Sequence, residues 1–176
     1  RLRDQASGTS VGFTVSTWRD EAGKLWEPGR LIAALVEAGT PTITLVAKSD
    51  LRHVTGALRT TAEENLAMVT DTVSYLVGLG REVILDAEHF FDGFLHDPDY
   101  TTSVLVAAHE AGAAVLVLCD TNGGTLPERV GAVTRAVIAA CAEATTSSVS
   151  DSPGAASFGS YRSRTLPEYT CRQPGS

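Results

Sequence analysis

Short aliphatic runs recur along the chain, and the later ones follow segments with helical spacing that end in glycine. Gly39, Gly80 and Gly112 fit the left-handed position at which helices commonly end. The runs after them are continuously apolar, which is typical of parallel strands buried on both faces. Together with a weaker first strand, the predicted strands are Val11–Ser16, Thr42–Val46, Val83–Leu85 and Val115–Leu118.

Helix start signals precede the apolar stripes between these strands. Thr61–Glu64 has the spacing of a capping box, and Thr125–Glu128 repeats it. Asp97 and Pro98 supply an N-cap and a proline in the first turn of another helix. A weaker pattern predicts a helix over Pro28–Ala38. Strand and helix therefore alternate, which requires right-handed crossovers between parallel strands.

The alternation predicts an α/β fold with about four parallel βα units. A doubly wound sheet and a (β/α)8 barrel both fit, because periodicity cannot distinguish them. A complete barrel takes about 250 residues. In the barrel interpretation, the chain is therefore a partial (β/α)8 barrel, roughly half of one.

The composition changes at Ala144, after which serine, threonine and glycine dominate and apolar residues are sparse. This predicts a disordered or unrelated tail over 144–176 and a single folded domain over 1–143. A chain of 176 residues can bury a core without a disulfide or metal. Because position 1 is Arg1 rather than methionine, we also expect a processed form or an excerpt of a longer protein.

Charge and composition argue against several classes of partner. The net charge is −7, with 14 basic against 21 acidic residues, so no basic stripe for nucleic acid is expected. Apolar runs such as Ala113–Leu118 are far shorter than the roughly 18 residues of a membrane span. The 3 cysteines form no C-x-x-C pair, which favours a reducing compartment. The sequence predicts a soluble, cytoplasmic protein.

Polar residues follow each predicted strand, at the end where both parallel architectures bind ligands. Asp86 and Glu88 are two apart on an extended segment, so they share a face. Such a pair suits metal binding or a general base, although capping or exposure to solvent explains it equally well. His89 follows on the opposite face, where we expect it to pack behind the strand end, hydrogen-bonded to a neighbour.

The segment Asp120–Gly124 follows the last strand and contains a threonine and two glycines. It lacks the glycine spacing and the lysine of nucleotide-binding loops. It is either a tight turn or a place where the Thr121 hydroxyl and nearby amides bind a carboxylate in front of a helix.

Four segments together resemble the citramalate synthases and the wider group of 2-isopropylmalate synthase, homocitrate synthase and hydroxymethylglutaryl-CoA lyase. They are Ser49–Thr61 (SDLRHVTGALRTT), Glu63–Met68 (EENLAM), Asp86–Gly93 (DAEHFFDG) and Leu118–Pro127 (LCDTNGGTLP). The resemblance implies a (β/α)8 barrel and a homodimer for the complete enzyme. It also implies condensation of acetyl-CoA with an α-keto acid, pyruvate, at a divalent metal (Mg, Mn or Zn), then thioester hydrolysis, in isoleucine biosynthesis. Alternatives are 2-isopropylmalate or homocitrate synthesis, or a noncatalytic α/β fragment.

The resemblance also implies roles for individual residues. Glu88 matches a catalytic glutamate near the metal and the acetyl group, and Thr121 matches a threonine that holds the keto-acid carboxylate. His53 and Asp86 are assigned to substrate binding. The family's D-x-x-x-R-D-G strand and H-x-H-N-D strand have no counterpart in this sequence. No residue is therefore assigned as a metal ligand, and we expect this chain to be inactive alone.

Overall fold

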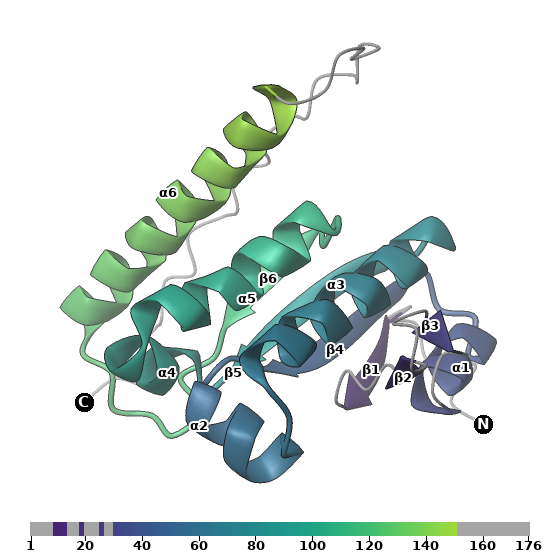
Figure 1. Ribbon diagram of the computed structural model, residues 1–176, viewed down its shortest axis with the longest axis horizontal. Coiled ribbons are helices and arrows are strands. Elements are labelled where there is room, and N and C mark those ends of the chain that lie inside the picture. The colour runs from purple at the N-terminus through teal and green to yellow at the C-terminus, as the bar shows by residue number, and fades with distance from the viewer. Residues whose placement is uncertain (1–8, 14–17, 20–24, 27–29, 151–176) are drawn as a thin grey trace, which may run out of the picture.

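The computed structural model describes residues 9–13, 18–19, 25–26 and 30–150. Four strands form one parallel sheet in the order β1-β4-β5-β6 (Figure 1). A short antiparallel pair, β2 (Trp18–Arg19) and β3 (Leu25–Trp26), lies outside it. The strands of the parallel sheet are β1 (Thr9–Phe13), β4 (Thr42–Lys48), β5 (Glu82–Glu88) and β6 (Val115–Leu118).

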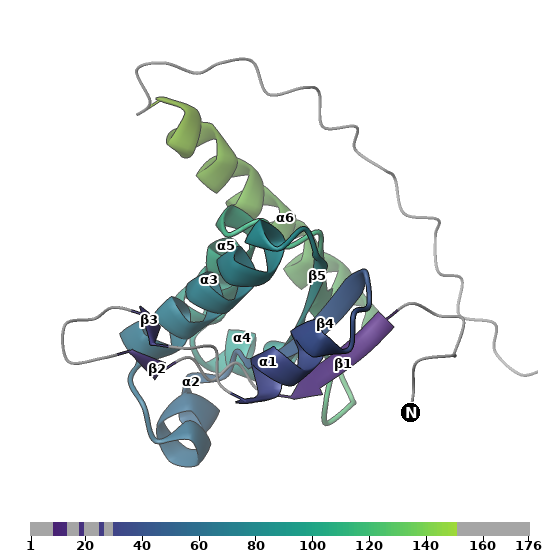
Figure 2. The same ribbon diagram turned by 90° about the vertical axis from the view of Figure 1, so that its right-hand side faces the viewer.

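The strand order decides between the two predicted architectures. Each strand of the sheet pairs with the next one along the chain, as in a barrel, whereas a doubly wound sheet reverses direction part-way. When each right-handed crossover leads to the next strand in the same direction across the sheet, all the connecting helices lie on one face of the sheet. Figure 2 shows α3 (Ala62–Gly78) and α5 (Pro98–Glu110) on the same face. The predicted fold, an α/β partial barrel, is confirmed.

Most predicted elements are present, with shifted ends. β4 and β5 extend beyond their aliphatic runs into polar residues, because backbone pairing continues to Lys48 and Glu88. The first strand spans Thr9–Phe13 rather than Val11–Ser16, and residues 14–17 lie outside the described part. The helix expected over Pro28–Ala38 is α1 (Arg30–Glu37).

Two of the three predicted helix starts have the expected caps. Thr61 Oγ1 accepts a hydrogen bond from Glu64 N at 3.2 Å, and an Asp97 carboxylate oxygen accepts one from Tyr100 N at 3.0 Å. At the third start, the Thr125 hydroxyl donates to Asp120 Oδ1 at 2.9 Å, so this side chain closes the preceding loop instead.

The last helix, α6 (Pro127–Ser150), runs beyond the predicted start of the tail at Ala144. The prediction of disorder is therefore wrong for residues 144–150. Once a helix is nucleated, each further residue adds one backbone hydrogen bond, so a sequence without apolar periodicity can still extend it. The rest of the predicted tail, 151–176, lies outside the described residues.

Three short elements follow directly on strand ends and were not predicted. After β4 come α2 (Leu51–His53) and the π-helical turn η1 (Val54–Leu58), and after β5 comes α4 (Phe90–His96). These elements are too short to show a helical period in the sequence. They carry the residues that surround the candidate site.

Candidate active site at the strand ends

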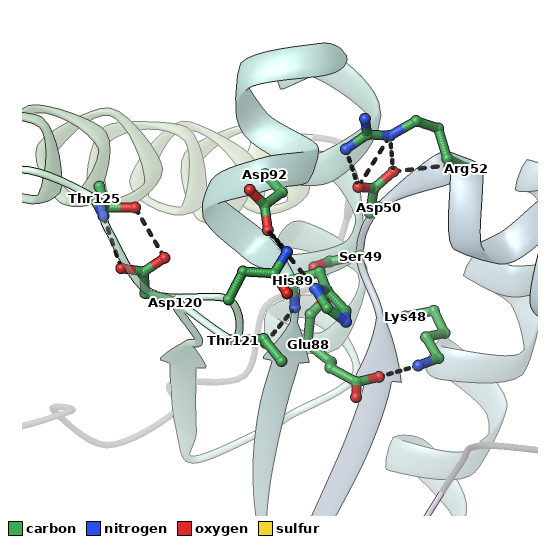
Figure 3. A network of polar contacts seen from close by, with 11 residues as sticks. Lys48, Ser49, Asp50, Arg52, Glu88, His89, Asp92, Asp120, Thr121 and Thr125 are labelled. Carbon is green, nitrogen blue, oxygen red and sulfur yellow. Dashed lines mark hydrogen bonds and ion pairs between the residues drawn. The ribbon is translucent and has the colours of Figure 1, made fainter.

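Glu88 and Lys48 form an ion pair at the carboxyl ends of β5 and β4. The two residues are in register across the strands, and they lie on the face opposite the helices. Figure 3 shows the Glu88 carboxylate directed toward the Lys48 ammonium. The side chains are 28% and 23% exposed, so both are partly open to solvent. The sequence indicated this face for Glu88 but not its pairing with Lys48.

A buried polar network fixes the backbone that carries this pair. The Ser49 hydroxyl donates to Glu88 O at 2.7 Å, which ties the two strand ends together. Asn65 donates through Nδ2 to Lys48 O at 3.0 Å and to the Tyr100 hydroxyl at 2.8 Å. Ser49 is 0% exposed and Asn65 2%, so these hydrogen bonds are shielded from water. The network holds both strand ends in place.

Helix α4 packs tightly on the turn after β4 at Gly93. A Cβ on this residue would lie 2.8 Å from Thr101 Oγ1 and 3.0 Å from both Ser49 O and Asp50 Cα. Thr101 Oγ1 also donates to Ser49 O at 3.0 Å. Glycine is therefore required at position 93 for α4 and α5 to reach this turn.

Asp50 has a structural role in the same turn. It accepts a hydrogen bond from Arg52 N at 2.9 Å, which caps α2, and its Oδ2 lies 2.6 Å from Arg52 Nη2. The hydrogen bond from the Arg52 side chain lowers the pKa of Asp50, although burial acts in the opposite direction. Both carboxylate oxygens are occupied by these contacts, so Asp50 is not available as a base.

Thr121 and His53 meet around His89, directly after β5. Thr121 Oγ1 accepts a hydrogen bond from His89 N at 2.8 Å, which leaves the hydroxyl hydrogen able to donate. The rings of His53 and His89 lie 4.2 Å apart, edge to face. His89 has a left-handed backbone with φ of 59°, an uncommon conformation for a residue with a side chain.

The predicted surroundings of His89 are corrected by this geometry. Its ring packs on His53 instead of hydrogen-bonding behind the strand. Nδ1 lies 3.7 Å from Asp92 Oδ2, too far for a hydrogen bond, and has no hydrogen-bond partner among the described residues. The prediction failed because the backbone of His89 is left-handed, so side chains no longer alternate between the two faces of the sheet after Glu88.

Asp86 lies on the same face as Glu88, two residues earlier along β5, and is in register with Val46 and Val117 of the neighbouring strands. Burial raises the pKa of Asp86. Burial also raises the pKa of Cys119, and the charges of Asp86 and Glu88 add to this shift. The shared face of the two carboxylates is as expected, but only Glu88 has a cationic partner among the described residues.

A pocket of about 350 Å³ lies between α4 and the loop from β6 to α6. Its lining includes Phe91, Leu95, Thr125 and Arg129, but neither member of the Lys48–Glu88 pair. Asn122 Nδ2 donates to Asp92 Oδ2 at 2.7 Å, which joins the loop to α4. The ion pair therefore lies on the open face of the sheet rather than in this pocket.

The described residues do not fit a complete metal site. Among them, no group of three or more His, Cys, Asp or Glu side chains is placed to hold a metal ion. Asp86 and Glu88 alone supply too few donors for the divalent metal that the resemblance implies.

Comparison with known proteins confirms the resemblance. No family model matches the chain. Over 108 residues, 61% of this chain, it is 58% identical to "(R)-citramalate synthase" of Streptomyces coelicolor, and over 106 residues it is 52% identical to that of Aquifex aeolicus. This chain is similar to the (R)-citramalate synthases. It spans 20% of the length of each of these two relatives.

More distant matches agree with this result. The chain is 36% identical over 90 residues to a 2-isopropylmalate synthase of Synechococcus, covering 51% of this chain and 16% of that protein. The crystal structure of HMG-CoA lyase from Brucella melitensis superposes with a TM-score of 0.55 at 19% identity, over 62% of this chain and 40% of the lyase. At this identity, the structural match supports the fold alone. The role of each predicted site residue, including Glu88 and Thr121, stays a prediction.

Proposed function

We propose that this chain contributes the Glu88 half of an active site that condenses acetyl-CoA with pyruvate, giving citramalate and CoA. The observation that carries the proposal is the Glu88 carboxylate, which lies at a strand end on the inner face of a barrel-like sheet, beside Lys48. The similarity to (R)-citramalate synthases supports the choice of reaction. Because the chain spans 20% of that relative, the proposal concerns part of an enzyme.

In the proposed reaction, Glu88 takes a proton from the methyl group of the acetyl thioester. The electron pair of the broken C–H bond forms the new bond to the keto carbon of pyruvate, and the keto oxygen takes up a proton. Water then hydrolyses the thioester and releases CoA. A positioned base typically contributes about 10² to 10⁴-fold to such a step. Lys48 orients the Glu88 carboxylate, and the Ser49 and Asn65 hydrogen bonds hold the strand ends that carry both.

The keto acid is proposed to bind on the neighbouring strand end. Thr121 already accepts a hydrogen bond from His89 N, so its hydroxyl hydrogen can be donated to a carboxylate oxygen. His53 lies next to His89, and we assign it, with Asp86, to the lining of the substrate site. The divalent metal that the resemblance implies would supply Lewis-acid activation of the keto group, but Asp86 and Glu88 do not form a complete site for it.

A chimera tests the proposal directly. The matched segment of the Streptomyces coelicolor relative would be replaced by the corresponding residues of this chain, and free thiol release would be followed with acetyl-CoA and pyruvate. We expect turnover, and a loss of about 10² to 10⁴-fold on Glu88→Gln. Glu82→Gln, on the same face of β5 but at its exposed start, is the matched control. A chimera that is fully active with Glu88→Gln would refute the assignment.

The choice of keto acid is tested in the same assay. We infer pyruvate as the keto acid because the chain is 58% identical to the (R)-citramalate synthase of Streptomyces coelicolor and 36% identical to the 2-isopropylmalate synthase of Synechococcus. Faster turnover with 2-oxoisovalerate or 2-oxoglutarate would instead support 2-isopropylmalate or homocitrate synthesis. The proposed product places the reaction in isoleucine biosynthesis in the cytoplasm. Within the described residues, none of the helices has the length and apolar character needed to span a bilayer.

A further inference from the structure

The proposed condensation needs an acid as well as a base. When the new carbon–carbon bond forms, one electron pair of the keto C=O bond moves onto the oxygen, which becomes an alkoxide unless a proton reaches it. A cationic donor placed where this charge develops stabilises the transition state. Because Glu88 is the proposed base, the donor must lie beside it, on the face of β5 that is opposite the helices.

Lys48 meets this requirement at the end of β4. The hydrogen bond from Asn65 Nδ2 to Lys48 O, 3.0 Å long, fixes its backbone, and its side chain extends across the sheet to Glu88 (Figure 3). Among the described residues, Glu88 Oε2 is the one acceptor in contact with the ammonium. An ammonium has three N–H donors, so two of them can reach a substrate. Glu88 Oε1 has no partner within the same part of the chain, so it can take the proton of the acetyl methyl group.

The neighbouring side chains are weaker candidates for the acid. Cys119 follows β6 beside Glu88, because its N–H donates to a β5 carbonyl at 3.3 Å and continues the pairing of the two strands. Burial and the carboxylate charges raise the pKa of Cys119, so its thiol keeps its proton but brings no positive charge to an alkoxide. The His53 ring packs edge to face on His89, and no contact joins it to Glu88 among the described residues. Lys48 is therefore the cation that this part of the chain places against the base.

We infer that Lys48 is the general acid of the reaction and protonates the keto oxygen; this inference rests on the proposed function. As Glu88 removes a proton from the acetyl methyl group, the C–H electron pair forms the bond to the keto carbon. The keto oxygen takes a proton from the Lys48 ammonium, which becomes a neutral amine. The protonated Glu88 then returns a proton to this amine across their existing contact, because a carboxylic acid is a much stronger acid than an ammonium. Both groups regain their starting charges, and no other donor is needed.

Two reactions of the Streptomyces chimera separate the acid from the base. Enolisation alone is followed in D₂O with oxamate, an analogue of pyruvate that does not condense, as deuterium enters the methyl group of acetyl-CoA. Condensation is followed as free thiol release with pyruvate. Glu88→Gln should slow both reactions by about 10² to 10⁴-fold. Lys48→Arg keeps a cation that can pair with Glu88, but an arginine is not deprotonated in proteins, so condensation should fall at least about 10²-fold and enolisation by less than about tenfold.

The outcomes distinguish this inference from the proposed function. Condensation by Lys48→Arg at the unsubstituted rate would overturn the inference, because Lys48 would then only hold Glu88 in place. If arginine distorts the site and both rates fall, Lys48→Met decides: enolisation that survives while condensation is lost supports the acid, and equal loss of both overturns it. Enolisation that does not depend on Glu88, or a chimera without either reaction, would overturn the proposed function itself, and this inference with it. Arg135→Met removes an exposed cation from α6 and should change neither rate.

Discussion

Replacement of Gly93 by alanine tests how the turn after β4 is held against α4. Alanine in a helix normally gains about 0.5 to 1 kcal/mol over glycine. Here the new methyl group would lie 2.8 Å from Thr101 Oγ1 and 3.0 Å from the backbone atoms Ser49 O and Asp50 Cα. The threonine can rotate, but the two backbone atoms can move only if the turn moves.

The steric cost decides the sign of this substitution. Overpacking a well-packed core costs about 1 to 3 kcal/mol, which exceeds the gain from helix propensity. We therefore expect Gly93→Ala to lower the free energy of unfolding by about 1 to 2 kcal/mol in urea denaturation. The loss should be larger if the displaced turn also breaks the hydrogen bond from Ser49 to Glu88 O.

Gly78→Ala is the matched control for this measurement. Gly78 is the last residue of α3, and a Cβ there would have no heavy atom within 4 Å. This variant should be unchanged or more stable by up to about 1 kcal/mol. If Gly93→Ala proved as stable as Gly78→Ala, the close packing of α4 on the turn would be refuted, and with it the explanation for glycine at this position.

Three further predictions concern buried polar groups. Asn65→Ala should cost about 1 to 3 kcal/mol in the same denaturation assay, because Lys48 O and the Tyr100 hydroxyl lose their donor, and Tyr100→Phe should cost less. Burial raises the pKa of Asp86, so the ionised carboxylate opposes folding and the protonated form does not. The stability of the folded state is therefore fully present below pH about 4 and falls as pH rises through the folded pKa. Asp86→Asn should stabilise the protein at neutral pH but not in acid. The pKa of Asp50 is lowered, chiefly by the Arg52 side chain, so the ionised carboxylate stabilises the folded state. This stabilisation is present above pH about 4 and is lost as pH falls through the folded pKa. Asp50→Asn should lower the free energy of unfolding at neutral pH, and its difference in stability from wild type should shrink in acid. Equal stability of Asp86→Asn and wild type at neutral pH would contradict the first of these two shifts, and a constant deficit of Asp50→Asn across pH would contradict the second.

Local patterns were sufficient to predict the strands and the long helices. The run Val115–Leu118 coincides with β6, and the Thr61 and Asp97 caps begin helices where the sequence places them. These features depend on residues within a few positions of one another. The end of α6 was mispredicted because serine and threonine signal a loop only when no helix is already growing into them.

The contacts around the site depend on residues far apart in the sequence. Asn65 reaches Tyr100, 35 positions away, and Ser49 reaches Glu88 O, 39 positions away. Each of these residues taken alone would suit an exposed helix or turn. Only the order of the strands in the sheet brings them together, and periodicity in this sequence could not choose that order. An asparagine beside the apolar stripe of α3, which begins at Leu66, was the one local hint of a buried polar contact.

The same strand order explains why the carboxylates of β5 have different environments. Glu88 is the last residue of the strand and reaches Lys48 of β4, with which it is in register. Asp86 lies between Val46 and Val117 in the sheet, and these neighbours offer no charge to balance it. Burial therefore raises the pKa of Asp86. Glu88, by contrast, keeps its ion pair with Lys48 at the strand ends, where both side chains are partly exposed to water.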